Sequence, residues 1–170
     1  FKEADLFLCI SHHMKEALLN LGCSDEKIQL QRLGVDINKF TFSPSPYKVS
    51  RKIHVLTIAR LVEKKGLQYG IYAIATLVKK YPYIEYTIIG DGRLKNSLNG
   101  LIETLKVGEH IRLLGGMQQD EIIDWLYKAD ILLCPSVTSH NGDQEGTPLV
   151  IIEALARGLP VLSTWHSGIP

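Results

Sequence analysis

Two acidic residues toward the end of the sequence have types and spacing that could bind a ligand. Glu145 and Glu153 bracket a helix-start signal, Thr147 followed by Pro148. With a rise of about 1.5 Å per residue, Glu153 lies roughly 7–8 Å along the helix axis from Pro148. The free amides and positive dipole end of such a start favour a phosphate, and ionised carboxylates accept hydrogen bonds from sugar hydroxyls. The stretch therefore predicts an elongated ligand with a phosphate centre and a sugar at each end.

A plainer interpretation of the same residues also stands. Arg157 follows Glu153 by four residues, and such a pair is an ordinary exposed helix contact, while Glu145 could be one more loop acid. Against this, the helix from 149 to 156 is apolar on nearly every face, which is typical of a buried helix. A lone acid in a buried helix needs a reason, so we favour a functional role.

The elements that must position these acids alternate between strand and helix. From residue 52 onward we expect strands at 53–59, 84–89, 111–114, 131–134 and 160–163, and helices at 66–80, 93–105, 118–128 and 148–157. Such alternation implies right-handed crossovers and a parallel sheet covered on both faces. The predicted fold class is α/β, with a doubly wound, Rossmann-like parallel sheet.

The first 51 residues read differently. We expect a strand at 4–10, a helix at 12–21 and a weaker strand at 28–33, followed by a polar stretch with prolines and serines. The helix is expected to turn Met14, Ala17, Leu18 and Leu21 inward. We predict three regions: the tail of a preceding domain at 1–36, a linker at 37–51 and the Rossmann-like domain at 52–170. Both ends look cut, and we expect an excised piece of a longer protein.

Ligands of open parallel sheets bind at the carboxyl ends of the strands. There the sequence places Arg60 and Lys65, then Gly90, then Gly115 to Met117, and finally the loop that ends in Glu145. Arginine grips phosphate with two N–H groups and lysine supplies a mobile charge. The alternative is that Lys64 and Lys65 are solvated surface charges and that Arg60 pairs with Glu63. Because these residues gather on one edge, we favour a binding role.

Composition narrows the function classes. The chain has 170 residues, of which 45% are hydrophobic and 22% charged, and its net charge is +1. This charge does not favour nucleic acid or an anionic membrane. The three cysteines, Cys9, Cys23 and Cys134, are far apart, which indicates buried reduced thiols and a cytosolic protein. No apolar run reaches the length of a membrane span.

Other candidate sites are weaker. Gly90-Asp91-Gly92 is half of a dinucleotide fingerprint, but Lys95 stands where the third glycine belongs. Asp143 with Glu145 could hold a metal, yet Arg60 and Lys65 already supply positive charge, so no metal site is predicted. No nucleophile constellation appears. His140 and His166 lie in loops at the predicted cleft edge, where they could touch substrate.

Five short motifs occur in one order along the chain. They are Ala-Arg-Leu-Val-Glu-Lys-Lys-Gly at 59–66, Ile-Ile-Gly-Asp-Gly at 88–92, Ile-Arg-Leu-Leu-Gly at 111–115, Ala-Asp-Ile-Leu-Leu-Cys-Pro-Ser at 129–136 and Glu-Gly-Thr-Pro-Leu-Val-Ile-Ile-Glu-Ala at 145–154. In these motifs the chain resembles the group 1 (family 4) retaining glycosyltransferases. That family has two facing Rossmann-like domains with a nucleotide sugar between them. Its usual glycine pair is replaced here by Ser167-Gly168. The long loop resembles the branch that builds bacterial exopolysaccharides such as colanic acid.

The resemblance implies a role for each matching residue. Arg60 and Lys65 would bind the diphosphate, and with Glu145, which holds the transferred sugar, they form the catalytic set. Glu153 would hold the ribose. The remaining donor-binding residues, mostly through backbone, would be Thr147, Leu149, Val150, Gly90, Gly115 and Met117. The chain would thus be the donor-binding, C-terminal half of a two-domain enzyme and inactive alone.

The implied reaction is transfer of a hexose from a UDP-, GDP- or ADP-sugar to an acceptor hydroxyl with retention. The resemblance implies no cofactor and no metal, a glycan or lipid-linked acceptor, a missing N-terminal domain, and a cytoplasmic site compatible with peripheral attachment at the inner membrane face. Alternatives left open are a nucleotide-sugar epimerase, a sugar phosphorylase, a non-catalytic nucleotide-binding module and, with Lys95 against it, a dinucleotide dehydrogenase.

Overall fold

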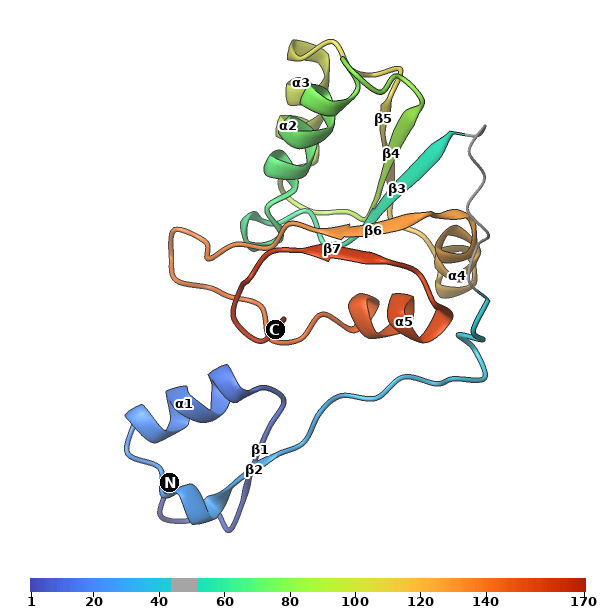
Figure 1. Cartoon of the computed structure of the whole chain (residues 1–170). Coiled ribbons are helices and arrows are strands. Elements are labelled where there is room, and N and C mark those ends of the chain that lie inside the picture. Colours follow the sequence, from blue (N-terminus) through green and yellow to red (C-terminus); the bar gives the residue numbers. More distant parts are fainter. Residues whose placement is uncertain (44–51) are drawn as a thin grey trace.

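A five-stranded parallel sheet organises the larger part of the chain, with strand order β5-β4-β3-β6-β7 (Figure 1). The structure, a computed structural model, describes residues 1–43 and 52–170. The strands are β3 (Ile53–Ile58), β4 (Ile84–Ile89), β5 (Ile111–Gly115), β6 (Ile131–Cys134) and β7 (Val161–Ser163). Along the chain, β4 and β5 are added on one side of β3, and β6 and β7 are then added on the other side. The boundary between β3 and β6 is the switch point of a doubly wound fold. The predicted fold class is confirmed.

Helices cover both faces of this sheet (Figure 1). They are the 3-10 turn η2 (Glu63–Lys65), α2 (Leu67–Leu77), α3 (Lys95–Thr104), α4 (Gln119–Lys128) and α5 (Leu149–Arg157). One apolar cluster fills the α2 and α3 side, around Leu67, Ile71 and Ile88. A second fills the α4 and α5 side, around Leu126, Leu132 and Ala154. Each expected strand and helix from residue 52 onward is present, with ends that differ by up to three residues.

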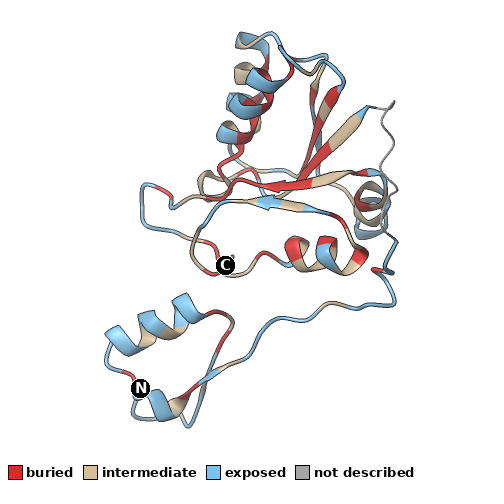
Figure 2. Cartoon of the chain, in the orientation of Figure 1, coloured by how far each residue is buried: buried red, intermediate tan, exposed pale blue. Residues whose placement is uncertain are grey.

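A smaller unit precedes the sheet. It consists of β1 (Phe7–Cys9), α1 (His12–Asn20), the 3-10 turn η1 (Asp25–Lys27) and β2 (Ile28–Leu30), with β1 and β2 paired in parallel. Both strands are shorter than expected. The inward-facing row predicted for α1 is wrong except at Leu18, since Met14 is 37% and Leu21 71% exposed (Figure 2). The reason is that two three-residue strands offer too little surface to cover one face of the helix.

The connection between the two units reaches the larger unit at Phe40. This side chain is buried in the cluster of α4 and α5, and Ser43 N–H donates a hydrogen bond to the carbonyl of Arg157. Most of the expected linker, residues 44–51, lies outside the described residues. In the described parts of the chain, none of the helices combines the length and hydrophobicity that crossing a membrane requires.

Gly66 brings the start of α2 against the end of β6. Its φ is +59°, and a Cβ atom there would lie 1.9 Å from the carbonyl oxygen of Pro135. A side chain would therefore force the two segments apart. The close approach places η2, which precedes α2, directly beside the long loop that follows β6. This contact assembles the candidate site.

Candidate functional site at the carboxyl edge of the sheet

The predicted site residues that make a direct contact are Lys65 and Glu145. The ammonium of Lys65 lies 2.7 Å from Oε2 of Glu145, and the two side chains are 16% and 7% exposed. The other oxygen, Oε1, is buried and accepts no hydrogen bond from the described residues. Lys64 Nζ lies 3.8 Å away from it, beyond hydrogen-bond distance. We call the group formed by Arg60, Lys65, Glu145, Glu153 and the start of α5 the carboxyl-edge site.

The residues of η2 hold the loop that leads to Glu145. Glu63 accepts hydrogen bonds from the main chain and imidazole of His140, and Lys64 donates to Asp143 at 3.0 Å. Lys64 also donates to the carbonyl of Gln144 at 3.0 Å, so with Lys65 each residue of this turn binds the loop. The interpretation of the lysines as solvated surface charges is wrong, because their partners lie about 80 residues away in the sequence. The sequence analysis did not predict these contacts between η2 and the loop. The only signal in the sequence was the opposite charge of the lysines of η2 and the acids of the loop.

The start of α5 differs from the prediction in one respect. Pro148 is the N-cap residue, and no side chain caps the first turn. Thr147, the predicted cap, instead donates its hydroxyl to the carbonyl oxygen of Gly168 at 3.0 Å. The amides of Leu149 and Val150 therefore lack a side-chain partner, which is the condition that favours an anion at a helix start.

Glu153 does not form the surface pair with Arg157 that the plainer interpretation offered. Arg157 is buried, donates to the carbonyl of Tyr127 at 2.5 Å and stacks on that ring. Glu153 is half-buried, and burial raises the pKa of its carboxyl above the ordinary 4.5. Most residues of α5 are buried or partly buried, as expected, while Leu149 and Leu155 are exposed.

Arg60 follows β3 at the same edge of the sheet and is exposed. Across residues 1–43 and 52–170, no hydrogen bond or ion pair engages its side chain. The predicted alternative, a pair with Glu63, is not formed because Glu63 binds His140. Among the described residues this two-pronged cation therefore has no partner, whereas the positive charge of Lys65 is paired with Glu145.

The glycines of the site serve backbone packing. Gly90 N–H donates to the carbonyl of Gly115 at 2.8 Å, and a Cβ at Gly90 would lie 1.8 Å from the carbonyl oxygen of Ala59. Gly90 is therefore required by close packing against the loop after β3. Met117, two residues beyond Gly115, packs in the same apolar cluster as Val150.

A narrow hollow lies between the ends of β3 and β6 and the start of α5. Lys65, Pro148 and Val150 line it together with Cys134. Burial raises the pKa of the Cys134 thiol to about 12, so the thiol is protonated at neutral pH and is no nucleophile. Cys9, Cys23 and Cys134 are all buried and free of disulfides, as expected.

The two acids considered as metal ligands are both engaged by lysines. Asp143 binds Lys64 and Glu145 binds Lys65. Within the two described ranges, no group of three histidine, cysteine, aspartate or glutamate side chains is placed to hold a metal ion.

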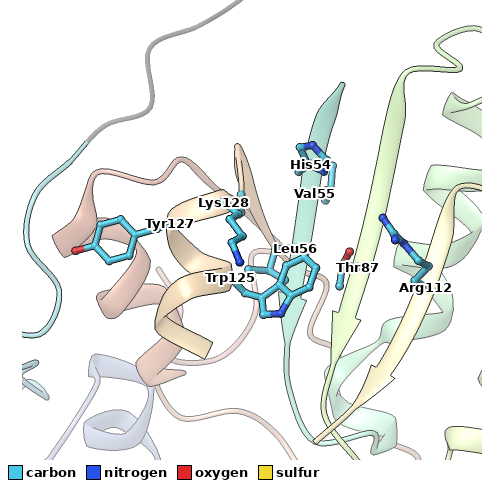
Figure 3. A pocket seen from close by; sticks show the side chains of 9 residues that line it. His54, Val55, Leu56, Thr87, Arg112, Trp125, Tyr127 and Lys128 are labelled. Carbon is cyan, nitrogen blue, oxygen red and sulfur yellow. The ribbon is translucent and has the colours of Figure 1, made fainter. Parts of the chain in front are cut away.

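A larger hollow lies at the opposite, amino end of the strands, between α4 and the sheet (Figure 3). Its volume is about 420 Å³. The lining residues are His54, Val55, Leu56, Thr87, Arg112, Trp125, Tyr127, Lys128 and Ala129. None of the predicted site residues lines it, so size alone does not identify the carboxyl-edge site.

Residues 38–170 match the family model described as "Glycosyl transferases group 1". The amylovoran biosynthesis glycosyltransferase AmsK of Erwinia amylovora is 40% identical over all of this chain and 42% of its own length. The putative colanic acid biosynthesis glycosyltransferase WcaL of Escherichia coli (strain K12) gives the same two percentages. The chain thus spans less than half the length of these curated relatives.

Among solved structures, the crystal structure of Anabaena Alr3699/HepE in complex with UDP and glucose is similar to this chain, with a TM-score of 0.80. The similarity covers 97% of this chain and 46% of that one, at 24% sequence identity. At this identity the likeness shows the fold alone. It agrees with the doubly wound sheet described above.

Proposed function

The chain belongs to the group 1 glycosyl transferases, and we propose that its carboxyl-edge site binds the nucleoside diphosphate sugar in a retaining hexosyl transfer. The observation that carries this proposal is the buried Oε1 of Glu145, which accepts no hydrogen bond from the described residues. A buried carboxylate oxygen without a donor is costly. A sugar hydroxyl placed there would supply the missing hydrogen bond.

The diphosphate would lie between the start of α5 and two cations. The uncapped amides of Leu149 and Val150 favour an anion, and the guanidinium of Arg60, which has no partner among the described residues, would be available to bind it. Lys65 adds a second positive charge, already fixed by Glu145. As the bond from the anomeric carbon to the diphosphate breaks, negative charge grows on the leaving group, and donors placed there in advance lower the barrier.

The two ends of the donor would use the remaining predicted residues. Glu153, one turn into α5 from the amides, would accept hydrogen bonds from the ribose hydroxyls. Gly115 and Met117 would border the base, and Gly90 would hold the neighbouring backbone in place. The donor in this proposal is a UDP-, GDP- or ADP-sugar.

The proposal extends to the whole protein as follows. We place the acceptor, a glycan or a lipid-linked glycan, in a facing domain supplied by the part of the relatives' length that this chain does not span. Residues 1–36 would be the end of that domain, 37–51 the crossover and 52–170 the donor domain. We propose a cytoplasmic enzyme that needs no metal, because cations of the protein already face the diphosphate.

Calorimetric titration of the protein with UDP, GDP and ADP, with and without a chelator, tests this function. We expect one of the three to bind, weakly and equally well with the chelator, and no turnover by the 170-residue chain alone. HepE was crystallised with UDP, which makes UDP the first probe. Failure of all three nucleotides to bind, or binding that requires metal, would contradict the proposal.

A further inference from the structure

The main chain around Glu145 is held by side chains of the loop that follows β7. Ser167 donates its hydroxyl to the carbonyl oxygen of Glu145 at 2.5 Å, and the N–H of Glu145 points to Nε2 of His166 at 3.4 Å. Two residues on, Thr147 donates to the carbonyl of Gly168 at 3.0 Å. The two segments are therefore joined on both sides of the Glu145 peptide unit.

Ser167 occupies a backbone conformation that disfavours its own side chain. Its φ is +50°, in the left-handed region that costs every residue with a Cβ and that glycine enters freely. Non-glycine residues hold such a conformation only where surrounding contacts enforce it. The contact in question is the hydroxyl bond to Glu145, which glycine could not make.

The loop has no room to move away. A Cβ at Gly168 would lie 2.8 Å from both the carbonyl oxygen of Gly146 and the side chain of Ser11 at the start of α1. Gly146 in turn packs against Ile10, since a Cβ there would lie 2.8 Å from its side chain. The loop is thus wedged between the smaller unit and the segment that carries Glu145.

We propose that Ser167 is a positioning residue that fixes the orientation of Glu145 and so determines how tightly the sugar of the donor is held. Lys65 holds one carboxylate oxygen, while Ser167 holds the main chain from which that side chain projects. Because both the carboxylate and its main chain are held, Oε1 of Glu145 points in one fixed direction. The inference rests on the proposed function, in which Glu145 binds the sugar and not the diphosphate.

The test compares affinity for the sugar conjugate with affinity for the nucleoside diphosphate alone. Full-length protein is titrated with UDP, GDP and ADP and with their glucose and mannose conjugates. Ser167→Ala loses the hydroxyl but keeps the strained φ, and we expect the conjugate to bind about 5- to 10-fold more weakly. Ser167→Gly relieves the strain and should lose less. Affinity for the nucleoside diphosphate should change less than about twofold in both variants, because its binding groups are untouched.

Two further variants separate positioning from folding. Ser163→Ala removes a comparable hydroxyl bond, to the carbonyl of Cys134 at 2.8 Å, and should leave the ratio of the two affinities unchanged. Ser167→Asn tolerates positive φ and carries an N–H donor, so it should recover part of the loss.

Three results would overturn the inference. The first is a wild-type ratio in Ser167→Ala, and the second is an equal loss for conjugate and free nucleotide. The third is an effect of the same size in Ser163→Ala. Failure of the wild-type protein to bind any nucleoside diphosphate is a separate outcome, seen before the variants are compared, and would remove the proposed function together with the inference.

Discussion

Two acids surrounded by cations lie at opposite ends of the strands, and they are satisfied to different degrees. At the amino end, Glu85 binds Lys52 through Oε1, and through Oε2 it binds Arg112 at 3.2 Å and His54 at 3.4 Å. The hydrogen bond from Lys52, aided by the nearby positive charges, holds the pKa of the Glu85 carboxyl below its ordinary value. Both of its oxygens have partners and the side chain reaches solvent.

At the carboxyl end, Glu145 is more deeply buried and only one of its oxygens is hydrogen-bonded. Charge clusters alone therefore do not distinguish the two ends. What distinguishes the two acids is that Glu145 has a buried oxygen that accepts no hydrogen bond from the described residues, next to the uncapped amides of α5. The comparison teaches that Glu85 stabilises the surface of the sheet, whereas Glu145 is kept for a ligand.

The largest difference should appear when each acid loses its charge. Glu145→Gln in the full-length enzyme should lower kcat/KM for the donor by about 10²–10³-fold, since it removes an oriented acceptor at the reacting sugar. Glu85→Gln is the matched control and should stay within about twofold. Steady-state kinetics decides between them, and equal losses in the two variants would erase the distinction.

The arginines at the two ends should differ next. Arg60→Ala should weaken nucleoside diphosphate binding by about 1.5–3 kcal/mol, roughly 10- to 150-fold, because a charged hydrogen-bond donor is lost. Arg112→Ala removes an arginine that is already paired with Glu85 and should have little effect on affinity. Calorimetry measures both. An unchanged affinity in Arg60→Ala would mean that the exposed guanidinium does not face the ligand.

A pH effect of intermediate size should occur only at the carboxyl end. Burial lowers the pKa of His166 below the ordinary 6.5. Of the ionisable groups that face the ring, Glu145 raises this pKa and His13 lowers it further. The neutral ring, which can accept the N–H of Glu145, therefore persists at neutral pH and is lost as pH falls through this lowered pKa. Affinity for the nucleotide sugar should fall over that range.

The control for this pH effect is His166→Gln, whose side-chain oxygen accepts a hydrogen bond without titrating in this range. In this variant the fall should move to lower pH. Titration of wild type and variant between pH 5 and 8 measures the difference. Superimposable pH profiles would show that another group controls the response.

The smallest effect concerns stability. Burial in the folded protein raises the pKa of Glu153 and so favours its neutral form. The contribution of this group to stability is therefore fully present below the ordinary 4.5 and is lost as pH rises through the folded value. Glu153→Gln should therefore stabilise the ligand-free protein at pH 7, by less than about 1 kcal/mol because the group is half-exposed. It should also weaken nucleotide binding.

Thermal melts with and without nucleotide check this prediction. The gap between wild type and Glu153→Gln should narrow as pH approaches 4.5, where the carboxyl becomes neutral in both folded and unfolded protein. If Glu153→Gln is instead less stable at pH 7, the half-buried carboxylate makes a stabilising hydrogen bond within the protein. That result would count against the proposal that Glu153 binds the ribose.

The regular part of the fold followed from local patterns. Apolar runs such as 84–89 and 131–134 specify buried strands whatever their partners, and the glycines Gly66 and Gly158 mark helix boundaries by their positive φ. Parallel pairing then brings the carboxyl ends together. For this reason Arg60, Lys65 and the loop of Glu145 could be placed at one edge before any coordinates were known.

The details of the site depend on partners that are distant in the sequence. Thr147 could cap its own helix or bond to Gly168, and only the packing of the β7 loop decides. Arg157 could meet Glu153 on the surface or enter the core beside Tyr127, and the position of α4 decides. Local propensity gives no preference between such alternatives, which is why the cap predicted for Thr147 was wrong and the partners of Arg157 were not predicted.

NMR titration of the ¹⁵N-labelled protein with UDP, GDP and ADP tests the central claim most directly, because it locates the bound nucleotide on the backbone. The account predicts the largest amide shifts at Leu149 and Val150, at the start of α5, and almost none at Thr87 and Arg112 around the other hollow. Shifts concentrated at Thr87 and Arg112, with the start of α5 unchanged, would contradict it.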